Sequence, residues 1–270
     1  MFQLLSDLIQ KTAWPMTAPR PYSLFHVLFS AAGIVLAAGL ALLLNGFPQK
    51  HGLTEKQTLH VLVSCGLLLS FSEVYKQLFL YVVVNHGCYD WWYFPFQLCS
   101  TPMYLCLFLP FIWKRPGIRR TVCTYLQDFC LLGGLMALLE PSGLLHSYWT
   151  LTLHGLLWHI LLVFIGMFCG TSGLAGRGTS EYLKALLLLG LFCLVATAVN
   201  VATHGQADMF YISPYYPVTQ IFFYQLSLRY GIRAGIVLYL IALCLGGFLV
   251  HLLMENYTKR KRAAAASRPF

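Results

Sequence analysis

The apolar residues of this chain occur in long runs, each close to the 20 or so residues that cross a bilayer as a helix. Seven such runs are separated by short polar or charged segments. The second run contains Glu73 and Lys76, and the third contains three prolines. We therefore predict an all-α membrane protein built as a seven-transmembrane-helix bundle. The predicted helices span residues 23–44, 58–84, 92–113, 120–139, 147–170, 181–202 and 231–254.

The segment between the last two predicted helices, 203–230, has 28 residues and is rich in aromatic side chains. Aromatic residues concentrate at membrane interfaces, so we expect an interfacial or re-entrant segment rather than a free loop. The sequence shows no internal repeat of the kind seen in many transporters. We expect a single transmembrane domain over residues 1–256, followed by a basic tail, 257–270, without regular structure.

Lysine and arginine are unevenly divided between the two sides that seven helices would define. One side has only Lys11, Arg20, Arg229 and Arg233, and Lys76 lies within a helix. Because basic residues concentrate in cytoplasmic segments, we predict an external N-terminus and a cytoplasmic C-terminus for a multi-pass protein of the cell membrane. The other side has 13 basic residues: Lys50, Lys56, Lys114, Arg115, Arg119, Arg120, Arg177, Lys184, Lys259, Arg260, Lys261, Arg262 and Arg268.

Composition agrees with a membrane protein, because 58% of the residues are hydrophobic, 10% are charged and the mean hydropathy is +0.67. A soluble domain of this size would need more charge to cover its surface. The net charge of +9 does not indicate nucleic-acid binding. The basic clusters at 114–120 and 259–262 flank predicted helices, where such clusters determine topology and meet anionic headgroups. We expect membrane lipids as partners and no nucleic acid.

Neither a metal nor a cofactor is expected. The nine cysteines are scattered, without the C-x-x-C or Cys/His spacing of a zinc site. His154 and His159 are five residues apart, which turns them by roughly 140° around a helix instead of placing them on one face.

Three polar residues on different predicted helices lie at a similar depth. At ~1.5 Å per residue, Cys99, His154 and Lys76 are each roughly 10–12 Å below the outer boundary. Glu73 lies a turn deeper on the face of Lys76, and His159 is also deeper. Ionisable residues in a membrane usually face the bundle interior or a wet cavity. The pattern predicts an outward-opening polar cavity lined by the second to sixth helices.

These residues also have structural alternatives. Glu73 and Lys76 can simply neutralise each other on one helix face. The histidines can form hydrogen bonds between helices, and a buried cysteine is more often a small hydrophobic residue than a nucleophile.

Cys99 differs from the other eight cysteines because it lies between Pro95 and Pro102. Each proline frees a backbone carbonyl and can kink a helix. An unwound helix at this point could present polar backbone groups to a reacting acyl carbonyl. A nucleophilic thiol also needs a base, and His154 is the nearest by depth.

The residues around these positions resemble the YwaF-like integral membrane family, which includes the animal proteins called transmembrane protein one-six-four. The resemblance extends over roughly residues 70–250 and implies a multi-span fold with a cysteine and a histidine at its functional centre. Animal relatives are described as phospholipid acyltransferases that use an acyl-cysteine. By motif position, Cys99 matches the acyl-accepting cysteine and His154 its partner. The matching motifs are Pro95-Phe96-Gln97-Leu98-Cys99, Gly133-Gly134 to Glu140-Pro141, and His154-Gly155.

The sequence departs from that family at two positions. Gln97 stands where many relatives have histidine, and Glu140 stands where a small polar residue is more usual.

We predict a thiol-dependent acyltransferase that acts on phospholipids. His154 would deprotonate Cys99, which would take an acyl chain and pass it to an acceptor hydroxyl. Gln97 or freed backbone groups would hold the oxyanion, the charged pair of the second helix would position the headgroup, and residues 208–230 would form a lateral gate. The candidate substrate-binding residues are Glu73, Lys76, Gln97, Glu140, His159 and Asn200.

Two other classes of protein fit the same pattern. A transporter or small-molecule binding protein could use the same cavity, and it would tolerate Cys99→Ala but not changes at Glu73 or Lys76. A scaffold or sensor would use the polar layer only for packing. A retinal protein is disfavoured, because the seventh predicted helix, 231–254, has no lysine for a Schiff base.

Overall fold

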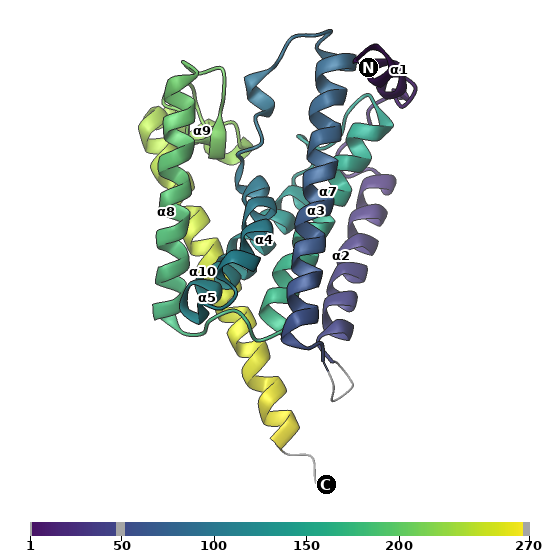
Figure 1. The fold of residues 1–270 in the computed structure, drawn as a ribbon. Coiled ribbons are helices and arrows are strands. Elements are labelled where there is room, and N and C mark those ends of the chain that lie inside the picture. The colour runs from purple at the N-terminus through teal and green to yellow at the C-terminus, as the bar shows by residue number, and fades with distance from the viewer. Residues whose placement is uncertain (1, 47–51, 267–270) are drawn as a thin grey trace.

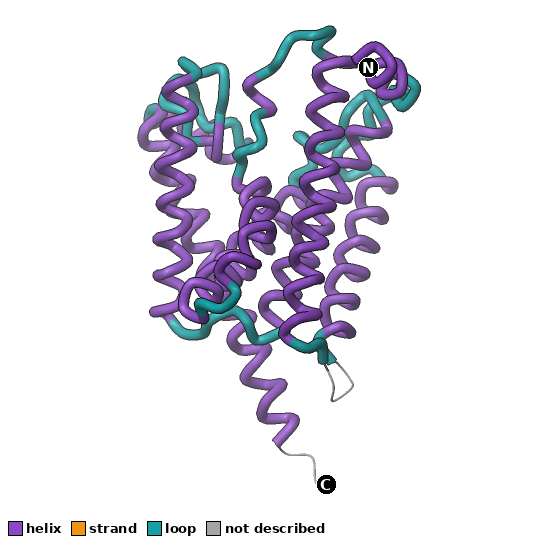
Figure 2. The backbone as a smooth tube through the Cα atoms, viewed as in Figure 1, coloured by secondary structure: helices purple, strands orange, loops and turns teal. Residues whose placement is uncertain are grey.

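The computed structural model describes residues 2–46 and 52–266, and across these residues it is helical, without a β-strand. The long helices stand side by side, and the N- and C-terminal ends of the chain lie at opposite ends of the bundle (Figures 1 and 2). The prediction of an all-α bundle is confirmed. Lys50 and Arg268, two of the basic residues used to predict the orientation, lie outside the described residues.

Within the described residues, six helices are long and apolar enough to cross a membrane, and they match six of the seven predicted spans. The second of them begins after Thr54, which forms a capping box with Gln57 and so satisfies the first backbone N–H groups of the helix. The six are α2 (Leu24–Leu44), α3 (Glu55–Phe79) with its π-helical end η1 (Leu80–Val84), the column α5 (Pro116–Tyr125), η4 (Leu126–Cys130) and α6 (Leu131–Leu139), then α7 (Trp149–Thr171), α8 (Thr179–Ala202) and α10 (Ile232–Ala266).

The segment predicted as the third span, 92–113, differs from the other six. Its α-helix, α4 (Thr101–Ile112), has 12 residues, which at ~1.5 Å per residue is shorter than the roughly 30 Å hydrocarbon core. The 3-10 turns η2 (Trp91–Tyr93) and η3 (Leu98–Ser100) precede it, separated by the non-helical residues 94–97. One proline lies in that irregular stretch and another at the start of α4, and neither can donate a backbone hydrogen bond. The span predicted at 92–113 is therefore helical without interruption only from Leu98 onward, and its backbone is unwound before the cysteine.

The interior of the bundle is formed by α7 and the α5–α6 column. In each of these two, 67% of the residues in the apolar stretch are buried inside the protein, compared with 22% in each of the other four long helices. Glycine allows the two to approach closely, since a Cβ added to Gly166 would lie 2.9 Å from the backbone of Leu131, and one added to Gly134 would lie 2.9 Å from the carbonyl oxygen of His159. Small residues are typical of tightly packed transmembrane helices. The outer helices α2, α3, α8 and α10 keep apolar faces exposed, as contact with lipid requires.

Two shorter segments cover the end of the bundle where the N-terminus lies (Figure 1). One is α1 (Phe2–Gln10). The other is the aromatic segment 203–230, which contains the turn η5 (Met209–Tyr211) and the helix α9 (Ile221–Tyr230) next to α10. Its residues 207–210 are buried, so it is packed against the bundle rather than free.

The prediction that the tail from residue 257 lacks regular structure is wrong for its first part, because α10 continues to Ala266. Lysine, arginine and alanine, which make up most of this part of the tail, favour helix. The ammonium group of Lys259 also lies 2.7 Å from the carboxylate of Glu255, one turn earlier on the same helix. The helix therefore extends beyond the apolar run from which it was predicted.

Candidate functional site

His154 lies on α7 and points toward α3. Its Nδ1 atom is 2.7 Å from the hydroxyl oxygen of Ser72. When Nδ1 carries the proton and donates it to this hydroxyl, the Nε2 lone pair is left free to accept a proton. Ser72 was not identified from the sequence. The signal was present, because Ser72 lies four residues before Lys76 and therefore on the same face of the helix.

The charged pair of α3 is formed as predicted, with the ammonium group of Lys76 2.8 Å from the carboxylate of Glu73. Glu73 is buried and also accepts a hydrogen bond of 2.7 Å from the side-chain amide of Gln77. The same amide donates to the carbonyl oxygen of Tyr93 at 2.6 Å. The ion pair thus neutralises charge inside the bundle. Gln77, which contacts both Glu73 and Tyr93, ties α3 to the turn η2.

Cys99 lies in η3, at the end of the irregular stretch, and is partly buried. Its carbonyl oxygen accepts a 3.0 Å hydrogen bond from the indole N–H of Trp158, and the Trp158 ring lies 5.3 Å from the ring of His154. Lys76 lies one turn after Ser72 on the same face of α3, and Ser72 contacts His154. The structure therefore brings Cys99, His154 and Lys76 into one neighbourhood. Across the described residues, no hydrogen bond joins the thiol directly to His154.

Gln97 and Asn200 hold the aromatic segment from two sides. The Gln97 amide donates to the carbonyl of Asp208 and accepts from the N–H of Phe210, both at 2.7 Å. The Asn200 amide donates to the carbonyl of Met209 at 3.0 Å and accepts from its N–H at 2.6 Å. Each side chain replaces the backbone partners that this turn lacks. For Gln97, only its second amide N–H is left for an oxyanion.

Asp208 begins the turn that these amides hold and lies outside the long helices. Burial raises the pKa of Asp208 to about 6, opposed by hydrogen bonds from the N–H of Ser213 and the hydroxyl of Thr219. The carboxyl group therefore titrates in mildly acidic solution.

His159 and Glu140 make local contacts. The buried His159 ring donates from Nδ1 to the carbonyl oxygen of Gly155, four residues earlier in α7, at 2.7 Å. Glu140 accepts hydrogen bonds from the N–H (3.3 Å) and the hydroxyl of Ser142, in the turn after α6.

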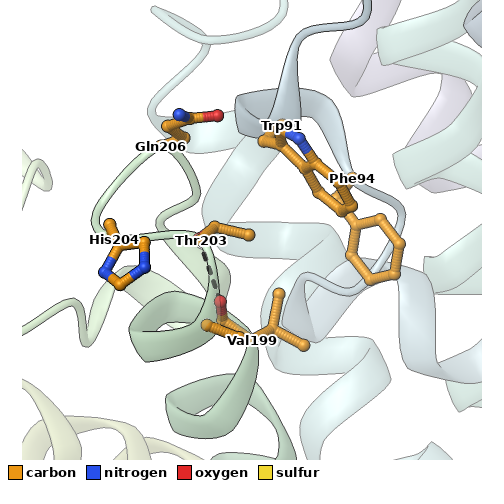
Figure 3. A pocket seen from close by; sticks show the side chains of 7 residues that line it. Trp91, Phe94, Val199, Thr203, His204 and Gln206 are labelled. Atoms are coloured by element: carbon orange, nitrogen blue, oxygen red, sulfur yellow. Dashed lines mark hydrogen bonds between the residues drawn. The ribbon is translucent and has the colours of Figure 1, made fainter.

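A cavity of about 420 Å³ lies beside the irregular stretch, between η2 and the end of α8 (Figure 3). Its walls are mainly apolar, with polar groups contributed by the loop after α8, and it is open toward the surface. The hydroxyl of Thr203 is not free, since it donates to the carbonyl of Val199 at 2.9 Å. The sequence did not predict this cavity. Its lining residues are Trp91, Phe94, Val199, Ala202, Thr203, His204 and Gln206.

A second buried polar pair was missed by the sequence analysis. Nδ1 of His251 on α10 lies 2.9 Å from the carboxylate of Asp128 in η4, and the side chains are 1% and 0% exposed. Gln127 donates a further hydrogen bond of 2.7 Å to the same carboxyl group. The sequence did contain a signal for this pair, because Asp128 and His251 are ionisable residues inside the predicted spans 120–139 and 231–254.

Comparison with known proteins identifies a family. Residues 21–249 match the TMEM164 family. No curated protein and no solved structure matches the chain. The matched range covers most of the chain and contains both Cys99 and His154.

Proposed function

Because the chain belongs to the TMEM164 family, a family of transmembrane proteins, we propose that it is a phospholipid acyltransferase that carries the acyl chain on Cys99. The observation that carries the proposal is the chain of contacts from the backbone of Cys99 through Trp158 and His154 to Ser72. The resemblance to YwaF-like proteins and to the acyltransferases described among animal relatives supports the same proposal.

We also propose seven passages through the cell membrane, with α4 and the turns before it as the short passage. The opposite positions of the two chain ends support an odd number of passages (Figure 1), and the basic residues support a cytoplasmic C-terminus. Irregular backbone is tolerated in a membrane where protein groups satisfy it. Tyr104 donates to the carbonyl of Pro95 at 2.7 Å, and Trp158 donates to that of Cys99.

In the first step, Nε2 of His154 takes the proton of the Cys99 thiol, and the thiolate attacks an ester carbonyl of a phospholipid. A C–S bond forms, the ester C–O bond breaks, and the leaving alkoxide takes the proton from the imidazolium. In the second step an acceptor hydroxyl attacks the thioester, gives its proton to His154, and releases the thiol form of Cys99. Substrate binding has to bring the thiol and the imidazole into hydrogen-bond contact, as is common for sites without substrate.

Backbone N–H groups beside the thiol are suited to hold the oxyanion. Gln97 precedes η3 and makes no capping hydrogen bond with its side chain. The first N–H groups of a helical turn, here those of Leu98 and Cys99, have no acceptor within the turn. Donors fixed next to a reacting carbonyl stabilise the developing negative charge.

The apolar cavity between η2 and α8 is the proposed path for the acyl chain. The expected gate, residues 208–230, is held at its start by Gln97 and Asn200. Trp91 and Phe94 line the cavity and belong to the stretch that leads to Cys99, which supports this path.

The test is intact-protein mass spectrometry of purified protein supplied with a phospholipid that has an isotope-labelled acyl chain. We expect a hydroxylamine-sensitive adduct that Cys99→Ser abolishes and that Cys88→Ser, at an exposed cysteine, leaves intact. His154→Gln should abolish acyl transfer, and Ser72→Ala should slow it by about 10- to 100-fold, as loss of an orienting partner typically does. Undiminished lipid acyl turnover in both Cys99→Ser and His154→Gln would refute the proposal.

A transporter or binding protein is the second candidate, and the buried Glu73–Lys76 pair favours it. That function predicts normal uptake in Cys99→Ala and loss of uptake in Glu73→Gln. An acyltransferase predicts that lipid acyl turnover is lost in Cys99→Ala and is less affected in Glu73→Gln.

A further inference from the structure

A second cavity has a volume of about 230 Å³, and its walls come from the start of α3, the start of α5 and the loop after α7. Figure 1 shows these parts of the backbone at the end of the bundle opposite α1. Two arginines, Arg119 and Arg120, and one acidic residue, Glu55, line the cavity. None of these residues belongs to the site around Cys99.

Arg119 is held in a fixed orientation. Its guanidinium carbon lies 4.8 Å from the centre of the Trp113 ring, and its Nη1 atom is 3.3 Å from the carbonyl oxygen of Trp113 and 3.3 Å from the carboxylate of Glu55. In the described part of the chain, these contacts use Nη1 alone. The remaining N–H groups of the guanidinium are left for an anion, which arginine can bind through two parallel hydrogen bonds.

The charges of the cavity favour an anion. Arg120 forms no ion pair within the described residues, so the three charged side chains together carry one net positive charge. Glu55 is 71% exposed, and exposed ion pairs are weak. A phosphate group can therefore compete with this carboxylate for Arg119.

The position of the cavity identifies the source of the anion. It lies where α3 and α5 begin and just after α7 ends, and the ends of helices long enough to cross a bilayer meet its headgroup region. Its volume is below the roughly 300–1,000 Å³ of pockets that enclose whole small molecules. Basic pockets between transmembrane helices bind the headgroups of anionic lipids. We propose that this cavity binds the phosphate group of an anionic phospholipid, independently of the acyl-transfer site.

The test is a titration of phosphatidylglycerol into detergent-purified protein, with bound lipid counted by native mass spectrometry. Arg119→Gln/Arg120→Gln should weaken the tightest site by about 30-fold, taking about 1 kcal/mol for each basic residue. Lys114→Gln/Arg115→Gln removes the same charge from exposed positions outside the cavity and should leave that site intact.

A further variant and a soluble anion complete the test. Glu55→Gln removes the competing carboxylate and should tighten lipid binding, a gain that misfolding cannot imitate. Equal losses in the two double variants, or no loss in either, would overturn the proposal. Stabilisation by inorganic phosphate at matched ionic strength, without any tight phosphatidylglycerol site, would overturn the assignment to a lipid.

Discussion

Replacing His251 by leucine removes one partner of the buried pair that joins α10 to η4. In the native protein the two side chains are 2.9 Å apart and almost completely buried. After the substitution, the carboxyl group of Asp128 keeps only its hydrogen bond from Gln127. It is then a polar group inside the bundle that has lost its main partner.

The expected cost follows from this burial. Removing one partner of a buried charged pair typically costs about 3–5 kcal/mol, and leaving a neutral buried polar group without its partner costs about 1–3 kcal/mol. The hydrogen bond from Gln127 is present before and after the substitution, so it does not enter the difference. We therefore expect His251→Leu to lower the free energy of unfolding by about 2–4 kcal/mol. Asp128→Asn keeps an acceptor for the imidazole N–H and should cost about 1 kcal/mol. In Asp128→Leu/His251→Leu neither polar partner remains, so the cost should be less than the sum of the single substitutions.

The assay is reversible unfolding in mixed detergent micelles, followed by tryptophan fluorescence. Lys184→Met is the control, because its ion pair with Glu181 is 51% exposed at the lysine and should contribute about 1 kcal/mol or less. If His251→Leu costs no more than this control, or if the two leucine substitutions are additive, the pair does not stabilise the bundle as argued.

Three other predictions follow from contacts described above. Burial raises the pKa of Asp208 from 3.8 to about 6, so folding favours the protonated form of its carboxyl group. The free energy of unfolding should therefore fall as the pH rises from 4 to 6, by at most about 3 kcal/mol. Asp208→Asn should remove this dependence in a series of thermal unfolding measurements at different pH. Gly166→Leu should destabilise the bundle by about 3 kcal/mol or more, whereas Gly190→Leu, with open space around it, should not. Trp158→Phe should reduce the acyl adduct on Cys99 while leaving the helix content measured by circular dichroism unchanged.

Most of the fold was predictable from hydropathy alone, because each long helix is a continuous apolar run, whether it packs in the interior of the bundle or on its outside. The third predicted span was not a full helix, since its prolines remove backbone donors and only α4 keeps regular geometry. The tail from residue 257 was mispredicted in the other direction, as irregular where the structure has a helix. Its charges suggested disorder, but its residues favour helix and continue one that is already formed.

That Cys99 and His154 lie near each other was predictable from the sequence, but their contacts were not. Helical rise placed Cys99 and His154 at one level, and the structure brings them into one neighbourhood. The link through Trp158 and the contact with Ser72 depend on how helices face one another, which spacing along a single helix does not specify. Gln97 was assigned to chemistry because it precedes the cysteine, yet its amide mainly holds the aromatic segment.

The irregular stretch before α4 has a consequence for biosynthesis. A translocon releases a segment into lipid when that segment is apolar and its backbone groups are already satisfied. Here the carbonyl of Cys99 finds its partner on Trp158, 59 residues later in the chain. The segment around Cys99 can therefore reach its final state only after α7 has been synthesised, and ribosomes stalled before that point should carry a chain whose Cys99 is still open to water-soluble thiol reagents.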